Sequence, residues 1–225
     1  MASRILLVFA TASEADILKR IPGISYNRDG YKIGDLNISV LITGVGGIST
    51  AWAMKQWLCG NPYPDLAINA GIAGSYADKL KKGDVVMPVS DCFADMAIEA
   101  GNKYLTLAEA GLMNPDEFPF DKGFIRADNK YVEKTVKILQ KVKAITVNTS
   151  SGTKTTIERL KSKYNPDIET MEGATFFYIC AMEKIPFLAV RAISNKVEPR
   201  NIKAWDIPLA LENLVGEINK ILLIL

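Results

Sequence analysis

Short apolar runs alternate with helical segments along most of this 225-residue chain, and this alternation restricts its fold more than any other feature. Two consecutive strands that are joined through a helix usually run parallel, because the helix carries the chain back across the sheet. The sequence therefore predicts an α/β fold with a mixed, mostly parallel central sheet and flanking helices. No linker or repeat interrupts the pattern, so we expect a single domain over residues 1–225.

The expected elements follow from apolar periodicity and from the turn residues that bound each run. The predicted strands cover residues 5–10, 31–33, 37–43, 66–69, 84–88, 144–148 and 187–193. The predicted helices cover residues 13–20, 48–58, 130–140, 154–164, 172–183 and 209–225. Gly34 and Asp35 would form a hairpin turn, the stretch NAGIAGS (69–75) a glycine turn, and residues 91–124 an irregular segment.

Charge and cysteine content narrow the possible partners. The net charge is only +2, with Lys and Arg dispersed among Asp and Glu, which argues against nucleic acid as the main partner. No apolar run reaches the roughly 18 residues of a membrane span, and the first strand is too short for a signal peptide. Cys59, Cys92 and Cys180 are far apart and odd in number, which indicates reduced thiols and a cytoplasmic protein.

The chain contains no histidine. Ser-His-Asp and Cys-His catalysis are therefore excluded, and so are zinc sites that use histidine. Three scattered cysteines cannot form a four-cysteine metal site. Any chemistry must rest on Asp, Glu, Asn, Ser, Lys, Arg, Tyr or backbone groups, and we expect neither a metal nor a cofactor.

In sheets of this kind, ligands bind beyond the carboxyl ends of the strands. Thr11 and Glu14 follow the first predicted strand with the spacing of a capping box, which by itself favours a structural role for Glu14. Glu172 lies near a predicted helix start. A carboxylate there can stabilise the helix through the helix dipole or can bind a ligand, and the sequence fits both roles equally well. The segment GVGGIS is a weak dinucleotide motif, because the third glycine and the downstream acid are missing.

Asn195 follows the buried strand predicted at 187–193, and it too fits either a structural role or a ligand-binding role. An asparagine side chain can stabilise a turn by bonding local backbone groups. It can also bind a ligand that needs both a donor and an acceptor, which one amide supplies and a carboxylate does not. The residues alone leave both explanations open.

Four longer stretches together resemble the nucleoside phosphorylase/nucleosidase superfamily, and most closely the family within it that hydrolyses the hypoxanthine nucleoside futalosine. They are INAGIAGSYADKLKKGDVV, DCFADMAIEAGNKYLTLAEAGL, ETMEGATFFYIC and VRAISNKVEPRNIKAWDIPLALENL. The resemblance covers essentially the whole chain. Methylthioadenosine nucleosidases of the same superfamily share parts of these motifs but have Asp where this chain has Asn195.

The resemblance implies cleavage of a purine N-glycosidic bond, which builds positive charge on the ribose and negative charge on the leaving base. Glu14 matches the family carboxylate that deprotonates the attacking water. Glu172 matches the carboxylate that accepts hydrogen bonds from the ribose hydroxyls and favours the cationic sugar. Met171 would pack against the sugar, and Arg191 would lie near the water and Glu14.

The resemblance also implies a base pocket. Ser194 and Asn195 would hold the purine, and residues 147–153 would line it. Asn195 can donate to O6 of a 6-oxopurine and accept from N7–H, whereas an ionised Asp would face the O6 lone pairs. The further lining residues implied are Ile72, Ala73, Gly74, Asn148 and Thr149.

The first alternative activity is that of another purine nucleosidase, of the aminofutalosine or methylthioadenosine type. A phosphorylase is disfavoured because Asn69 stands where phosphorylases carry Arg; a non-catalytic nucleoside-binding module is disfavoured because Glu14 and Glu172 are both present. Arg200 is a candidate for binding the carboxylate of the substrate's 5′ side, although such loop charges are often merely solvated. The small-molecule nucleoside is the expected partner, and the resemblance implies a homodimer in which residues 95–120 close the partner's pocket.

Overall fold

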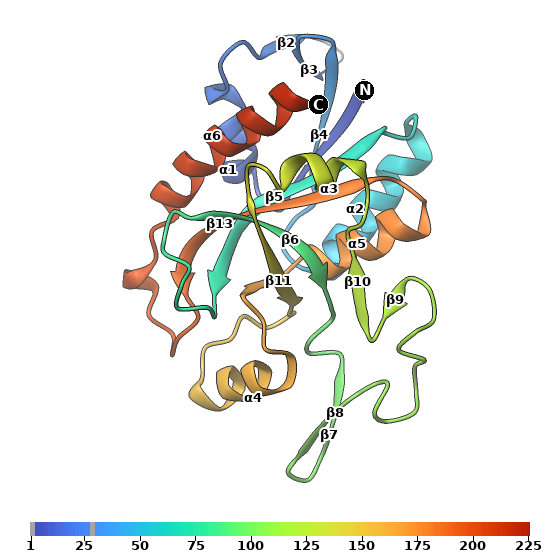
Figure 1. Cartoon of the computed structure of the whole chain (residues 1–225), viewed down its shortest axis with the longest axis vertical. Helices are drawn as coiled ribbons and strands as arrows, with labels where there is room; N and C mark the ends of the chain where they lie inside the picture. Colours follow the sequence, from blue (N-terminus) through green and yellow to red (C-terminus); the bar gives the residue numbers. More distant parts are fainter. Residues whose placement is uncertain (1–2, 28–29) are drawn as a thin grey trace.

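One eleven-stranded sheet runs through the computed structural model, which describes residues 3–27 and 30–225 (Figure 1). The strands are β1 (Arg4–Phe9), β2 (Ser25–Asn27), β3 (Gly30–Ile33), β4 (Leu36–Ile42), β5 (Leu66–Ser75), β6 (Val85–Asp91), β7 (Ala97–Ala100), β8 (Lys103–Thr106), β9 (Phe120–Asp121), β10 (Phe124–Arg126), β11 (Gln140–Thr146), β12 (Ile168–Thr170) and β13 (Phe187–Lys196). The helices are α1 (Ala12–Ala15), α2 (Gly47–Gly60), α3 (Lys130–Thr135), α4 (Lys154–Tyr164), α5 (Gly173–Met182) and α6 (Ile207–Ile224), with 3₁₀ turns η1 (Asp16–Arg20) and η2 (Ile202–Ala204).

The sheet is mixed, and its longer ladders are parallel. Strand β1 pairs in parallel with β4 and β5, β13 with β5, and β11 with β6 and β12. Antiparallel pairing is confined to shorter ladders, including β12 with β5 and β13 with β6. Strands β5, β12, β11, β6 and β13 thereby close into a ring, in which each strand pairs with the next. The predicted α/β architecture is confirmed.

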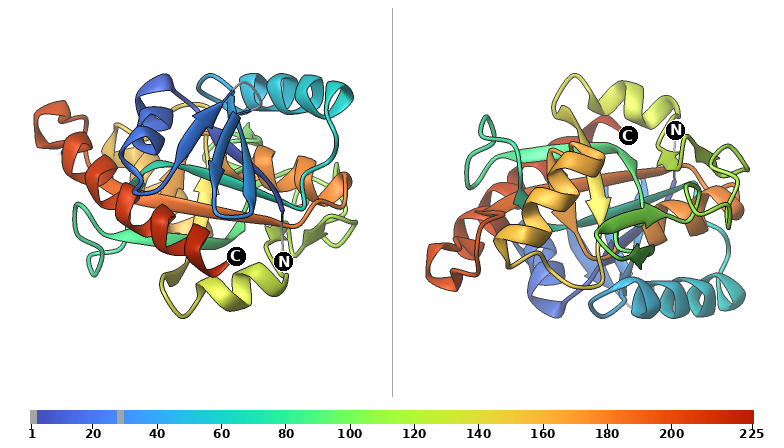
Figure 2. Two further views of the ribbon diagram at one scale, coloured as in Figure 1. Left: turned by 90° about the horizontal axis from the view of Figure 1, so that it is seen from above. Right: turned by 90° about the horizontal axis from the view of Figure 1, so that it is seen from below.

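Helices cover both sides of this sheet (Figure 2). Helices α2 and α5 pack against one another, and α6 runs along β13. Phe176 and Phe177 of α5 are fully buried and belong to the core, whereas Tyr178 of the same helix is exposed. Within residues 3–27 and 30–225, no helix has the length and apolar composition needed to cross a membrane.

The prediction of a glycine turn at 69–75 is wrong, because β5 continues through this stretch to Ser75. The glycines instead allow neighbouring groups to approach the strand closely. A Cβ atom on Gly71 would lie 2.6 Å from Oε1 of Glu14. The local signal of a turn was therefore overridden by the pairing of β5 with β1, β12 and β13.

Several other boundaries differ from the predicted ones. Helix α3 ends at Thr135, because the chain must be extended from Gln140 to pair with β6. Strand β13 runs on to Lys196, and the short strand β12 was not predicted. The segment 91–124 is not wholly irregular, since it contains the hairpin β7–β8 and strands β9 and β10. The hairpin around Gly34 and Asp35 is confirmed.

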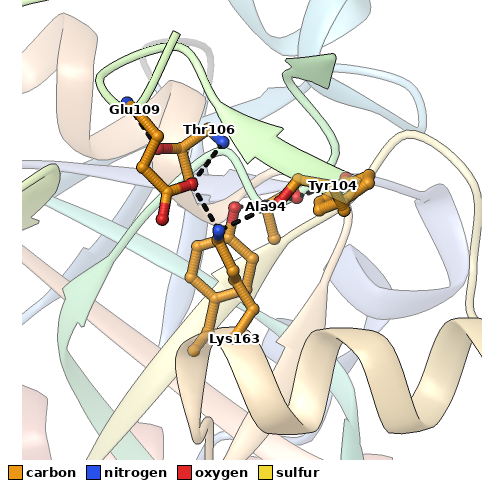
Figure 3. Close-up of polar contacts among 6 residues, drawn as sticks. Ala94, Tyr104, Thr106, Glu109 and Lys163 are labelled. Atoms are coloured by element: carbon orange, nitrogen blue, oxygen red, sulfur yellow. Dashed lines mark hydrogen bonds and ion pairs between the residues drawn. The ribbon is translucent and has the colours of Figure 1, made fainter. Parts of the chain in front are cut away.

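The β7–β8 hairpin projects from the sheet but is fastened to α4 of the same chain (Figures 1 and 3). The ammonium group of Lys163 donates to the Tyr104 carbonyl oxygen over 3.0 Å and forms an ion pair with Glu109. The Tyr104 hydroxyl donates to the Ala94 carbonyl oxygen over 2.8 Å. These contacts hold the segment after β6 in a defined position beside α4.

Candidate active site

A cavity of about 450 Å³ opens where β1, β5, β12 and β13 end. It brings together side chains from segments that lie far apart in the sequence. The predicted site residues that line it are Glu14, Ile72, Ala73, Gly74, Met171, Glu172, Ser194, Asn195 and Arg200. The placement of this cavity follows the rule for α/β sheets, in which ligands bind beyond the carboxyl ends of parallel strands.

Glu14 is held by three donors. Its Oε2 atom accepts from the Thr11 amide over 3.0 Å and from the Thr11 hydroxyl over 2.9 Å. Its Oε1 atom accepts from the backbone amide of Ile72 over 3.1 Å. The predicted capping box is therefore present, but the carboxylate also reaches across to β5 and lines the cavity. A fixed, largely buried carboxylate of this kind can accept a proton from a bound water.

Glu172 precedes α5 and also lines the cavity. Its side chain makes no capping hydrogen bond to its own helix. Its Oε1 atom instead accepts from the backbone amide of Gly46 over 2.9 Å. Burial raises the pKa of Glu172 above its ordinary value, while the Gly46 amide and the charge of Arg191 oppose that rise. Stabilisation of the helix dipole alone does not explain why the Glu172 side chain bonds to Gly46 instead of to its own helix.

Asn195 lies within β13, next to an irregularity in the pairing of β13 with β5. Its Oδ1 atom accepts from the Ser194 hydroxyl over 2.7 Å, and its amide nitrogen donates to the Lys196 carbonyl oxygen over 2.9 Å. An amide has two N–H groups and two acceptor lone pairs, so one of each remains for a ligand. Asn195 is therefore in a strand and not in a turn, and its side chain bonds one local backbone group.

Arg191 is almost fully buried and is not among the residues that line the cavity. Its guanidinium group donates to the Asn69 carbonyl oxygen over 2.7 Å, to the Asn69 side-chain oxygen, and to the Val190 carbonyl oxygen over 3.1 Å. Burial lowers the pKa of Arg191, while the charges of Glu172 and Glu14 oppose that change. Arg191 therefore lies behind the cavity wall and not in the cavity itself.

Asn148 and Thr149 are exposed and do not line the cavity, which corrects their predicted place in the base pocket. The physical reason is Asp95, whose carboxylate binds this turn. It accepts from the Asn148 side-chain amide over 3.1 Å and from the Thr149 backbone amide over 3.3 Å. The neighbouring Ser150 and Ser151 line the cavity instead.

Sequence reasoning missed Glu169, a buried carboxylate that lines the cavity from β12. It accepts hydrogen bonds from the Ser151 amide over 2.9 Å, from the Ser151 hydroxyl, and from the Tyr76 hydroxyl over 3.0 Å. Burial raises the pKa of Glu169, and these donors oppose that rise. The available signal was the first carboxylate of ETMEG, directly after the apolar Ile168, but without a predicted β12 nothing placed it at the site.

Comparison with known proteins agrees with this geometry. The family model described as the Phosphorylase superfamily matches residues 4–223, so the chain belongs to the phosphorylase superfamily. A futalosine hydrolase of Streptomyces coelicolor is 29% identical over 228 residues, covering 96% of this chain and 94% of that protein. A 5′-methylthioadenosine/S-adenosylhomocysteine nucleosidase of Psychromonas ingrahamii is 29% identical over 198 residues, covering 82% of this chain and 83% of that protein.

Solved structures show the same fold. The native structure of futalosine hydrolase of Helicobacter pylori superposes with a TM-score of 0.83 at 16% identity, covering 99% of this chain and 98% of that one. A 5′-methylthioadenosine/S-adenosylhomocysteine nucleosidase from Helicobacter pylori, bound to butyl-thio-DADMe-Immucillin-A, gives a TM-score of 0.83 at 16% identity, with 99% of each chain covered. Because the two similarities are equal, the fold does not choose between these activities, and the site residues must do so.

Proposed function

We propose that this chain hydrolyses the N-glycosidic bond of futalosine, releasing hypoxanthine and dehypoxanthinylfutalosine, a step that the family resemblance assigns to menaquinone biosynthesis. The observation that carries the proposal is the presence of Glu14, Glu172 and Asn195 around one cavity. Two carboxylates suit a reaction that builds positive charge on the sugar. A neutral amide suits a leaving base that carries an oxygen at position 6.

In this proposal each group has a separate role. Glu14 orients the attacking water and takes its proton. Glu172 accepts hydrogen bonds from the ribose hydroxyls, and its charge favours the cationic sugar in the transition state. Met171 packs against the sugar. Asn195 donates to O6 of the base and accepts from N7–H, and because an amide cannot supply a proton, the proton on N7 comes from solvent.

A phosphorylase would need charge-assisted donors for a phosphate dianion. Asn69 stands at the position where the related phosphorylases carry Arg, and its side chain is used inside the protein. The Asn69 amide donates to the Val8 carbonyl oxygen over 3.0 Å, and its oxygen accepts from Arg191. Glu14 would also repel the phosphate. These contacts support water as the acceptor.

The proposal is tested by following base release in phosphate-free buffer. We expect futalosine to be cleaved at full rate, with free hypoxanthine and a free sugar as products. Adding phosphate should not change the rate. A ribose-1-phosphate product, or a requirement for phosphate, would overturn the assignment as a hydrolase, and an absence of base release would overturn the enzymatic assignment itself.

We also propose that the chain forms a homodimer in which residues 95–120 of one subunit close the pocket of the other. This segment is fastened to α4 of its own chain through Lys163 (Figure 3). It nevertheless exposes the apolar side chains of Met96, Leu112 and Phe118. Light scattering should give twice the mass of one chain. Phe118→Asp should weaken that dimer, and a protein that is monomeric at assay concentrations would contradict the proposal.

A further inference from the structure

Helix α5 begins without a cap from the residue that precedes it. Glu172 stands at the position where a side chain ordinarily accepts a hydrogen bond from an amide of the first turn. Its carboxylate makes no such bond and accepts from the Gly46 amide instead. Gly173 and Ala174, the first two residues of the helix, are buried. Their amides therefore need other acceptors, because an unpaired buried N–H group is costly.

Two threonines of neighbouring strands supply these acceptors. The Ala174 amide donates to the hydroxyl of Thr146, the last residue of β11, over 2.7 Å. The Gly173 amide donates to the hydroxyl of Thr170, the last residue of β12, over 3.2 Å. Thr146 pairs directly with Thr170 in the sheet, and their hydroxyl oxygens lie 3.1 Å apart. The start of α5 is thus capped from the sheet.

Asp91, the last residue of β6, sets the direction of these hydrogen bonds. The Thr146 hydroxyl donates to both Asp91 carboxylate oxygens, over 3.0 and 3.1 Å. A hydroxyl has one hydrogen, so the hydrogen between the two threonines comes from Thr170. The Thr146 oxygen then accepts from Thr170 and from the Ala174 amide, which uses both of its lone pairs. A Cβ atom on Gly173 would lie 2.1 Å from Oδ2 of Asp91, so glycine there lets the carboxyl group lie against the first turn.

Thr146 and Asp91 are both buried, and neither lines the cavity. An effect of Thr146 on the reaction must therefore pass through other residues. Without the Thr146 hydroxyl, the natural acceptor for the Ala174 amide is the Glu172 carboxylate, because a side chain at this position bonds to the second or third amide of the helix. A carboxylate oxygen that turns back onto its own helix turns away from a bound sugar.

We propose that Thr146 and Thr170 cap α5 in place of Glu172, whose carboxylate is thereby left free for the ribose hydroxyls. Asp91 holds the Thr146 hydroxyl in the orientation that this capping needs. The inference rests on the proposed function and deepens it, because it names the residues that keep the sugar-binding carboxylate in position. Thr146 is a positioning residue, since it contacts α5 and not the substrate.

The test compares inosine with 2′-deoxyinosine, measured as the ratio of kcat/KM. The unmodified protein should prefer inosine, since Glu172 accepts from the 2′-hydroxyl. Thr146→Val keeps the shape of the side chain but removes its hydroxyl. It should reduce the preference roughly ten- to hundredfold, the range for one lost hydrogen bond to a charged group. Thr146→Ser keeps the hydroxyl and should retain the preference.

Thr135→Val is the matched control for this substitution. Thr135 is a fully buried threonine of α3, and its hydroxyl makes no hydrogen bond within residues 3–27 and 30–225. It does not line the cavity, so the control should keep the preference of the unmodified protein. A merely structural role for Thr146 would lower the rates on both nucleosides and leave their ratio unchanged.

A second measurement uses the unmodified protein and does not depend on a variant that folds. Because its acceptor is a buried hydroxyl, the Ala174 amide should exchange with solvent as slowly as the amides in the middle of α5. Rapid exchange of this amide, or an unchanged preference in folded Thr146→Val, overturns this inference alone. Failure of the unmodified protein to release hypoxanthine from futalosine would overturn the proposed function instead.

Discussion

The two ends of the cavity are held in different ways. At the end with Glu14 and Glu172, most donors are backbone amides, from Thr11 and Ile72 to the first and from Gly46 to the second, and the Thr11 hydroxyl is the one side-chain donor among these bonds. At the end with Glu169 and Asn195, most donors are side-chain hydroxyls, from Ser151 and Tyr76 to the first and from Ser194 to the second, and the Ser151 amide is the one backbone donor among these bonds. Backbone donors exist in any chain with this fold, whereas side-chain donors exist only in some sequences.

This difference separates chemistry from specificity. The carboxylates proposed to act on the water and the sugar depend on the path of β5 and on the turn before α2, which a point substitution does not easily change. The groups proposed to bind the base are themselves held in place by individual hydroxyl and amide side chains. We infer that related chains can exchange the base they accept while keeping the same reaction, and the following predictions probe each end separately.

The largest effect is expected at the end of the cavity that contains Glu14 and Glu172. Glu14→Gln keeps the shape of the side chain and part of the capping box but removes the base. Loss of a positioned general base lowers the rate by roughly 10²–10⁴-fold, whereas loss of a helix cap costs about 1 kcal/mol of stability. Steady-state kinetics and thermal unfolding of the same sample separate the two. A variant with near-normal turnover would restore a purely structural role for Glu14.

The sequence predicted this end of the site better than the other. Met171 and Glu172 were found because they stand in a long family motif, and Glu14 because the resemblance extends over the whole chain; the structure places all three around the cavity. Helix 154–164 was also predicted with its observed bounds. Its ends are set by local residues: Thr153 caps its start, and Asn165 adopts the left-handed conformation at its end. Local signals were sufficient in these cases.

The remainder depends on contacts that a sequence does not display. The glycines of β5 were mistaken for a turn, although they make room for the Glu14 carboxylate. Strand β12 has only three residues, too few for a period to be recognised, so Glu169 was overlooked. Asn148 was misplaced because its position is fixed by Asp95, a residue more than fifty positions away in the chain.

The next largest effect is expected from Asn195→Asp, at the end of the cavity proposed to bind the base. An ionised carboxylate beside O6 leaves that acceptor unpaired, which costs about 1–3 kcal/mol, or roughly ten- to hundredfold in kcat/KM for the hypoxanthine nucleoside. A protonated Asp can donate to N7 of an adenine nucleoside, and burial favours that protonated form. The preference should therefore move toward adenine. An unchanged ratio in a folded variant would mean that Asn195 does not contact the base.

Stability should also depend on pH through Asp91, the last residue of β6. This carboxyl group is buried behind α5, where burial raises its pKa to about 7, although the Thr146 hydroxyl and the charge of Arg191 oppose the rise. Because the folded-state pKa exceeds the unfolded value of 3.8, the folded chain binds an extra proton between these values. The free energy of unfolding should therefore fall as the pH rises from about 4 to about 7, by up to about 1.4 kcal/mol per pH unit.

Denaturant unfolding at several pH values measures this dependence. Asp91→Asn removes the titrating group while keeping a side chain of the same shape, so the slope of stability against pH should become shallower. The variant Asp116→Asn, at an exposed carboxylate outside the sheet, should keep the slope of the unmodified protein. Identical slopes for Asp91→Asn and the unmodified protein would show that Asp91 is ionised throughout this range.

The smallest effect is expected at the cavity rim, where Arg200 lies over the Trp205 ring with 5.4 Å between the guanidinium carbon and the ring centre. Both residues line the cavity. Lys196 is already paired with Asp78, and Lys203 does not line the cavity, so Arg200 is the better placed of the three to bind a substrate carboxylate. Because Arg200 is exposed, solvent screens its charge, and the interaction should contribute only about 0.5–1 kcal/mol.

Arg200→Ala should therefore raise KM for futalosine by roughly two- to fivefold at low salt, an effect that shrinks as the ionic strength increases. Inosine lacks the carboxylate, so its KM should change little. Lys203→Ala is the matched control, since it removes a neighbouring positive charge outside the cavity and should affect neither substrate. Equal changes for futalosine and inosine would remove Arg200 from the carboxylate pocket and leave the Trp205 side of the cavity to bind the substrate through apolar contact alone.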